Sequence, residues 1–306
     1  MYELRRILVP TDFSHHADDA MEHAVFMGSR YEAEIVALHV DEFIVSPLGA
    51  SDVSDPAIVA YQERKRQYLE QQFGRICEAV KEHPVRVQTL VIPGRAYKVI
   101  VEEAEKKEYD LVVIATRGLT HLSPYLMGST AERVVRLSRQ PVLSLQSAPK
   151  HGGAISSVLC PTDFSPAGNV ALSYALSIAR RYRALLYIQY VSELEHPEKE
   201  ADIRKRIPPM EEHHPLAQEV KIEYVFDRDV EPSNSIIRFA DDREIDLIVM
   251  STHGRRGLRR VHIGNTTAEV VRQSTRPVLT ITHPFHKKIF TAPVTQARVS
   301  PLSGRR

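Results

Sequence analysis

Two pairs of glycines are the residues of this chain with the clearest chemical potential. Gly118 and Gly128 in the first half recur as Gly254 and Gly264 in the second, ten positions apart in each case. The first glycine of each pair follows an apolar run, and the second opens a helical pattern. Unpaired N–H groups in the first turn of a helix bind anions, phosphates above all, so each half is expected to carry a phosphate cradle. Four polar side chains add donors at the same helix starts: Ser129, Thr130, Asn265 and Thr266.

An acidic residue closes the first apolar run of each half. Pro10-Thr11-Asp12 recurs as Pro161-Thr162-Asp163. At the carboxyl edge of a parallel sheet, such a carboxylate can accept hydrogen bonds from a ribose hydroxyl or a base amine. The alternative is that each Asp stabilises the following turn by bonding its own backbone, and the two roles are compatible. A phosphate cradle facing an acceptor has the dimensions of a nucleotide site.

The two halves repeat one another. Residues 7–14 (ILVPTDFS) return as 158–165 (VLCPTDFS), displaced by 151 (158 − 7), and residues 110–118 return as 246–254, displaced by 136 (246 − 110). This period is too long for a solenoid, so it indicates a duplicated domain, and 306 residues suit two domains. The predicted organisation is a first domain over 1–148, a second over 155–283 and an extended tail over 284–306.

Short apolar runs alternate with helical patterns in each half. This alternation predicts right-handed βαβ crossovers and, twice in tandem, a doubly wound five-stranded parallel sheet with helices on both faces. The helix predicted over 60–81 should bury Tyr61, Tyr68 and Phe73. Between 192 and 220 the second half is 15 residues shorter (151 − 136) and rich in proline. We expect the corresponding helix there to be shortened or replaced by a loop.

Composition narrows the classes of function. The net charge is +1, so no global field attracts nucleic acid or a membrane. The two cysteines, Cys77 and Cys160, show no paired spacing, and no apolar run approaches a bilayer span or a signal peptide. These features predict a cytoplasmic protein. The 14 histidines show no ligand spacing, so a metal site is not expected.

Both halves resemble the universal stress protein family. The resemblance rests on the opening ILVPTDFS, the runs into Ala-Thr-Arg-Gly and Ser-Thr-His-Gly, the helix start Gly-Ser-Thr-Ala-Glu-Arg-Val-Val and the closing Pro-Val-Leu. It implies a Rossmann-like fold of the adenine nucleotide alpha hydrolase type and ATP, with or without Mg²⁺, as the ligand. Family members pair through their last strands. The resemblance therefore implies a pseudo-dimer within the chain, 142–145 meeting 278–281, and leaves a homodimer of whole chains open.

The resemblance also assigns site residues. ATP-binding members carry Gly-x2-Gly-x9-Gly-(Ser/Thr), which this chain matches at Gly118, Gly128 and Ser129. Three positions depart from that pattern: Ala115 and Ser251 replace the leading glycine, and Asn265 replaces the terminal hydroxyl residue. Both pockets are expected to accept ATP, with the first half closer to the pattern. By the same resemblance, six residues surround the nucleotide: Asp12 and Asp163 at the adenosine, Val40 and Val191 at the base, and Arg117 and His253 at the phosphates.

Three functions follow from these patterns. The leading hypothesis is an ATP-binding regulatory protein of the stress response with an unknown protein partner. The first alternative is a scaffold of the same fold that binds no nucleotide. The second is a nucleotidyl-transferring enzyme, although the His-x-Gly-His and Ser-Gly-Gly-x-Asp-Ser signatures of such enzymes are replaced here by Pro-Thr-Asp-Phe-Ser. Without a Walker lysine, a placed general base or a carboxylate pair for metal, slow ATP hydrolysis is the most that is expected, and no residue is assigned a catalytic role.

Overall fold

The first half alternates strands and helices as the sequence predicts. The computed structural model describes residues 3–42, 56–118, 127–148, 153–194, 198–207, 215–252 and 264–282. In the first half the elements are β1 (Arg6–Pro10), α1 (His15–Tyr31), β2 (Glu34–Asp41), α2 (Pro56–Val80), β3 (Arg86–Pro93), α3 (Ala96–Lys106), β4 (Leu111–Ala115), α4 (Ser129–Leu137) and β5 (Val142–Leu145).

The second half repeats this order with an altered middle. Its elements are β6 (Ser157–Pro161), α5 (Pro166–Tyr182), β7 (Leu185–Glu193), α6 (Glu200–Arg204), the 3₁₀ helix η2 (Pro215–Glu219), β8 (Ile222–Asp229), α8 (Pro232–Asp242), β9 (Leu247–Ser251), α9 (Asn265–Gln273) and β10 (Val278–Ile281). A five-residue helix and a 3₁₀ turn stand where the first half has the 25 residues of α2. In the described part of this segment, the prediction that the helix is shortened or replaced is confirmed.

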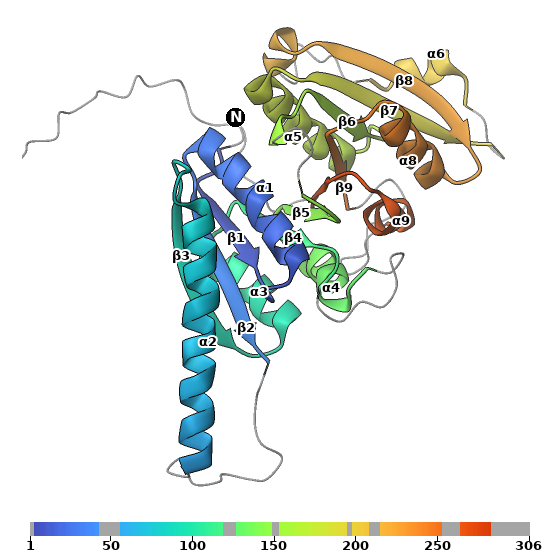
Figure 1. The fold of residues 1–306 in the computed structure, drawn as a ribbon. Coiled ribbons are helices and arrows are strands. Elements are labelled where there is room, and N and C mark those ends of the chain that lie inside the picture. The colour runs from blue at the N-terminus through green and yellow to red at the C-terminus, as the bar shows by residue number, and fades with distance from the viewer. Residues whose placement is uncertain are drawn as a thin grey trace, which may run out of the picture.

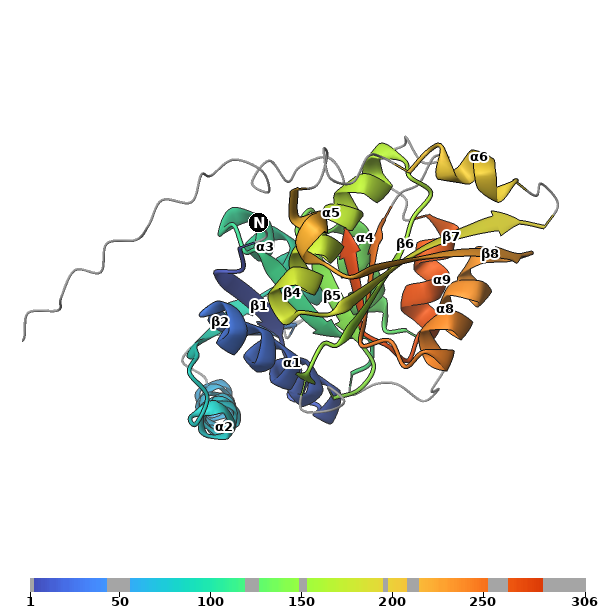
Figure 2. The ribbon, with the colours of Figure 1, turned by 90° about the horizontal axis from the view of Figure 1, so that it is seen from above.

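The described strands form one continuous sheet in the order β3-β2-β1-β4-β5-β10-β9-β6-β7-β8 (Figures 1 and 2). Strands run parallel within each half, and the halves join where β5 and β10 pair antiparallel. Leu143 faces Leu279, its own counterpart at a displacement of 136 (279 − 143), so the join has pseudo-twofold symmetry. The pairing predicted between 142–145 and 278–281 is confirmed. Because the halves are antiparallel, the carboxyl ends of their strands lie at opposite edges of the sheet.

Two apolar cores cover the two faces of the sheet, and each runs across the join. One lies under α1, α2 and α5 and includes Ala24, Ile76 and Leu172. The other lies under α3, α4, α8 and α9 and includes Ile100 and Val270. Right-handed crossovers place helices on both faces here because the strand order runs one way from β1 to β3 and the other way from β4 to β5. The doubly wound architecture of each half is therefore as predicted.

Helix α2 extends well past the end of the sheet in Figure 1. Only its carboxyl-terminal part packs closely, through Phe73, Ile76 and Val80. Tyr61 is 43% exposed and Tyr68 is 51% exposed, so the prediction that both belong to the core is wrong. The spacing of apolar residues marks the inner face of a helix but carries no information about where the neighbouring sheet ends.

A second symmetric contact links the halves through the ends of α1 and α5. The guanidinium of Arg30 donates to the backbone oxygen of Arg181 (3.3 Å), and that of Arg181 donates to the backbone oxygen of Arg30 (2.5 Å). Each guanidinium also lies over the opposite tyrosine ring, Arg30 at 5.9 Å from Tyr182 and Arg181 at 5.0 Å from Tyr31. Such contacts are attractive because the ring face is negative.

The described residues leave out part of what the sequence predicts. The tail over 284–306, together with His253 and Gly254, lies outside them. Where helices are described, none combines the length and apolar character needed to cross a membrane.

Two glycines make a matched test of the join. Gly153 has φ +81°, and a Cβ added there would lie 2.4 Å from Cγ of Phe26, which stacks on Tyr182. Gly153→Ala should lower the free energy of unfolding by about 1–3 kcal/mol. Gly74→Ala, at a solvent-exposed position of α2 with no atom within 4 Å, should raise it by about 0.5–1 kcal/mol. Urea unfolding measures both, and equal effects would contradict the packing described here.

A buried histidine should make stability depend on pH. His23 lines a cavity of ≈ 40 Å³ between the halves, and burial lowers its pKa from 6.5 to about 4, an effect that a backbone hydrogen bond with Ser147 only partly offsets. As the pH falls from 7 to 4, the unfolded chain takes up a proton on this ring before the folded chain does. Stability should therefore fall by about 3 kcal/mol from this group alone. His23→Phe should remove that share in urea titrations. An unchanged pH slope would show that the ring titrates normally.

Candidate functional site

The turn after β1 is held by its own polar side chains. The Thr11 hydroxyl accepts a hydrogen bond from the Phe13 N–H (3.0 Å), and the Asp12 carboxylate accepts one from the Ser14 N–H (3.0 Å). Ser14 then caps α1 by accepting from the Ala17 N–H (3.2 Å). The structural role foreseen for Asp12 is thus present, and it fixes the carboxylate at the carboxyl end of β1.

The second half builds the same turn. The Thr162 hydroxyl accepts from the Phe164 N–H (3.0 Å), and the Asp163 carboxylate accepts from the Ser165 N–H (2.9 Å). Ser165 caps α5 through the Gly168 N–H (3.1 Å). Asp163 therefore occupies the same position in its half as Asp12 does in the other.

Phe13 and Phe164 adopt a backbone conformation that is rare for bulky residues, with φ of 63° and 56°. The ring of each phenylalanine stacks on an aromatic side chain of the neighbouring strand. Phe13 lies 4.7 Å from His39 on β2, and Phe164 lies 6.0 Å from Tyr190 on β7. Left-handed backbone at a bulky residue costs about 1–3 kcal/mol and is concentrated at binding sites. The same left-handed backbone in both halves is consistent with a binding role for these turns.

Gly118 lies against Asp12. A Cβ added to Gly118 would be 2.5 Å from an oxygen of the Asp12 carboxylate. The two residues, 106 positions apart (118 − 12), are thus brought together where β4 and β1 end side by side. A side chain at 118 would displace the carboxylate from this position. This closeness places the acceptor and the loop of the predicted cradle at one edge.

The helix starts of both halves are built alike. Gly128 and Gly264 are the N-cap residues of α4 and α9, and neither offers a side chain to the first-turn N–H groups. Their own N–H groups donate to the backbone oxygens of Thr116 and Thr252, each at 2.7 Å. The donors left for an anion are therefore the N–H groups of the first helical turn, those of Ser129 and Thr130 or of Asn265 and Thr266.

The described glycines of the two predicted cradles do not adopt positive φ. Gly128 and Gly264 have φ of −64° and −61°, and Gly118 is not among the positive-φ glycines. A left-handed backbone therefore does not explain the choice of glycine at 118, 128 or 264. What remains is the close approach of backbone to neighbouring atoms, as at Gly118.

The remaining predicted residues lie around these turns. Val40 and Val191 are half-buried near the ends of β2 and β7, on the sheet face that carries α4 and α9. Ala115 is buried at the end of β4. Ser251 lies at the end of β9, and its backbone oxygen accepts a hydrogen bond from the Thr267 hydroxyl (2.9 Å). The other members lie at strand ends and first helical turns: Pro10, Thr11, Pro161, Thr162, Ser129, Thr130, Asn265 and Thr266.

Arg117 is directed toward the join between the halves. Its guanidinium donates to the side-chain oxygen of Gln146 (2.9 Å), whose amide donates in turn to the backbone oxygen of Arg272 (3.3 Å). The phosphate contact that the resemblance implies for Arg117 stays a prediction. Its partner in that expectation, His253, lies outside the described residues.

The arrangement is suited to binding. Across the described ranges, no group of three or more His, Cys, Asp or Glu side chains is placed to hold a metal ion. A pocket of ≈ 760 Å³ lies between α1 and α2 and contains none of the predicted site residues. The predicted sites flank residues 119–126 and 253–263, which the structure does not describe.

Comparison with known proteins identifies the family. The model of the universal stress protein family matches residues 3–145 and again 155–282. The chain belongs to the universal stress protein family.

Relatives support a tandem arrangement. A universal stress protein of Mycolicibacterium smegmatis is 25% identical over 90% of this chain and 96% of its own length, and one of Synechocystis is 24% identical over 90% and 99%. A crystal structure of a universal stress protein from Archaeoglobus fulgidus has a TM-score of 0.69 at 22% identity, covering 92% of this chain and 97% of that one. These relatives extend over both halves.

Sequence reasoning missed a polar cluster in the second half. Gln189, Asp227 and Ser235 are linked by hydrogen bonds near the end of β7. The internal repeat could have revealed Gln189, because this residue replaces the apolar Leu38 at the displacement of 151 (189 − 38). A polar residue at a core position of a repeat is a sign of altered function in one copy.

Gly118→Ala tests whether the glycine makes room for Asp12. The new Cβ should displace the carboxylate and lower the free energy of unfolding by about 1–2 kcal/mol. In an Asp12→Ala background the same change should cost almost nothing, because the contact is gone. Gly264→Ala is the control, since its nearest atom, the Thr252 oxygen, is at 3.6 Å. Additive effects of Asp12→Ala and Gly118→Ala in urea unfolding would contradict the contact.

Proposed function

We propose that the chain is a regulatory protein of the stress response that binds ATP in its first half and a nucleotide at the equivalent place in its second half. The observation that carries the proposal is the juxtaposition of Asp12, Gly118 and an uncapped helix start at one sheet edge. N–H groups at the start of α4 favour a polyanion through hydrogen bonds and the helix dipole. The Asp12 carboxylate is an acceptor for the sugar or base.

The walls of the first site suit adenine. Val40 on β2 and Met127 before α4 are partly buried against the same apolar core, on the face where α4 begins. Beneath Val40, Leu38 is fully buried. An apolar floor accepts the face of a purine, while the strand ends supply backbone groups for its edge.

Regulation is favoured over catalysis. The described part of the site offers carboxylate, hydroxyl and backbone groups, without a paired nucleophile and base. Mg²⁺ would arrive with the phosphates, because no cluster of ligating side chains is described for it. ATP binding would influence other proteins by shifting the populations of conformations that differ in affinity for it.

Titration calorimetry with ATP tests the proposal in the full chain. Gly128→Glu places a carboxylate at the cap of α4, where it should repel the phosphates and abolish binding in the first half. Gly74→Glu is the matched control, because it adds the same charge at an exposed point of α2 and should leave ATP binding unchanged. Equal ATP binding by wild type and Gly128→Glu would refute the site. Absence of binding by the wild type would favour the scaffold alternative.

A further inference from the structure

The two halves differ in chemistry directly beneath the proposed base-binding residues. Leu38 and Gln189 are equivalent, because each pairs with the last residue of the first strand of its half, Pro10 and Pro161. Ile92 and Asp227 are equivalent by register, because they pair with Val40 and Val191. Val99 and Ser235 are both the fourth residue of an 11-residue helix. An aliphatic cluster in the first half thus becomes the cluster Gln189–Ser235–Asp227 in the second.

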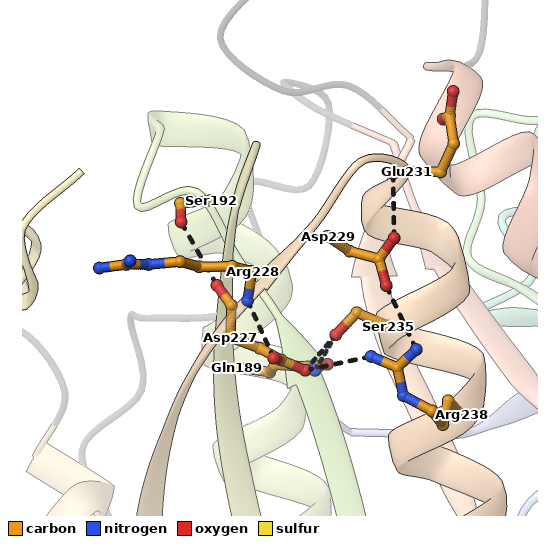
Figure 3. Close-up of polar contacts among 8 residues, drawn as sticks. All are labelled: Gln189, Ser192, Asp227, Arg228, Asp229, Glu231, Ser235 and Arg238. Atoms are coloured by element: carbon orange, nitrogen blue, oxygen red, sulfur yellow. Dashed lines mark hydrogen bonds and ion pairs between the residues drawn. The ribbon is translucent and has the colours of Figure 1, made fainter. Parts of the chain in front are cut away.

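The hydrogen bonds of this cluster converge on Asp227 (Figure 3). The Gln189 amide donates to the Ser235 hydroxyl (3.2 Å), which donates to one oxygen of Asp227. The other oxygen of Asp227 accepts from the backbone N–H of Arg228 (2.9 Å). The guanidinium of Arg238 lies 3.8 Å from the carboxylate and balances its charge. The Asp227 side chain is therefore held in one orientation from three sides.

Stability does not account for these side chains. Gln189 and Ser235 are 0% exposed, and the side-chain oxygen of Gln189 has no hydrogen-bond partner among the described residues. A buried polar atom left unpaired lowers the stability of the folded state. The first half fills the same space with aliphatic carbon and avoids that cost. Retaining a polar cluster here points to a role in binding.

The cluster adjoins the residues proposed to hold the nucleoside. The backbone oxygen of Gln189 accepts from the N–H of Thr162 (2.9 Å), next to Asp163. Gln189 and Val191 face the same side of β7 because side chains alternate along a strand. Asp227 is the register partner of Val191, and its side chain is 36% exposed, so it is the member of the cluster that a ligand can reach.

We propose that the second half selects a guanine nucleotide, with Asp227 as the base-recognising residue and Gln189 and Ser235 as positioning residues. This inference rests on the proposed function, because it assumes a nucleotide in each half. Guanine carries adjacent N1–H and N2–H donors on one edge, which pair with the two oxygens of a carboxylate. Adenine offers an acceptor, N1, at that place and would set a lone pair against the carboxylate. A bidentate pair of this kind separates bases by about 1–3 kcal/mol, or about 5- to 150-fold in affinity.

The test compares GTP and ATP by calorimetry in full-length chains with one site blocked. With Gly128→Glu, only the second half is open, and GTP should bind about 5- to 150-fold more tightly than ATP. With Gly264→Glu, only the first half is open, and ATP should be preferred. Asp227→Asn in the Gly128→Glu chain should remove most of the preference for GTP. Asp229→Asn is the matched control, since Asp229 also pairs with Arg238 but is two residues further along β8.

A triple variant gives an independent reading. Gln189→Leu, Ser235→Val and Asp227→Ile together recreate the first-half cluster, and they should reverse the preference toward ATP. The melting temperature shows whether each variant is folded. If the triple variant does not fold, the isosteric Asp227→Asn variant alone tests the role of Asp227. The inference is overturned if the second half prefers ATP, binds both equally, or binds neither while the first half binds ATP. If neither half binds any nucleotide, the proposed function fails as well.

Discussion

The backbone pairing of β5 with β10 is the contact on which the rest of the structure depends. It sets Leu143 against Leu279 across a pseudo-twofold axis and turns two five-stranded sheets into one of ten described strands. Each half thereby covers the edge strand that the other would expose, and edge strands invite unwanted pairing. The same symmetry explains the reciprocal bonds of Arg30 and Arg181. It also places the two candidate sites at opposite edges of the sheet, so that a single ligand cannot bridge them.

The candidate sites depend on backbone more than on side chains. Threonine, aspartate and serine fold the first turn of each half onto itself, and this forces Phe13 and Phe164 into left-handed backbone. Stacking on His39 and Tyr190 helps to offset the strain. Because the turn is fixed by local hydrogen bonds, its carboxylate is in position before any ligand arrives. Preorganisation of this kind reduces the entropy lost on binding.

Much of this architecture could be predicted from the sequence, because hydrophobic periodicity and internal repetition are properties of the chain itself. The alternation of strands and helices and the shortened middle of the second half followed from these, whereas the β5–β10 pairing followed from the resemblance to the universal stress protein family. The exposure of Tyr61 and Tyr68 could not be predicted in this way, because helix periodicity does not show where the neighbouring sheet ends. The rotamer of Arg117 and the equivalence of Ile92 with Asp227 also required coordinates. In the latter case the sheet register is one residue away from the displacement of 136, which would pair Asp227 with Val91.

Duplication explains how one half can change its chemistry while the other keeps it. The fold needs from each half only a sheet, its covering helices and a last strand that pairs across the axis. The cluster of Gln189, Ser235 and Asp227 lies between β7, β8 and α8, away from that axis, so its cost in stability does not weaken the join. A symmetric homodimer would carry such a cluster, and its cost, in both subunits. Within a tandem chain, the first half can keep an aliphatic cluster at this place. The second half can carry a polar cluster there, at a cost in stability that arises only once. Unequal sites on a symmetric frame are therefore a direct consequence of joining the two domains covalently.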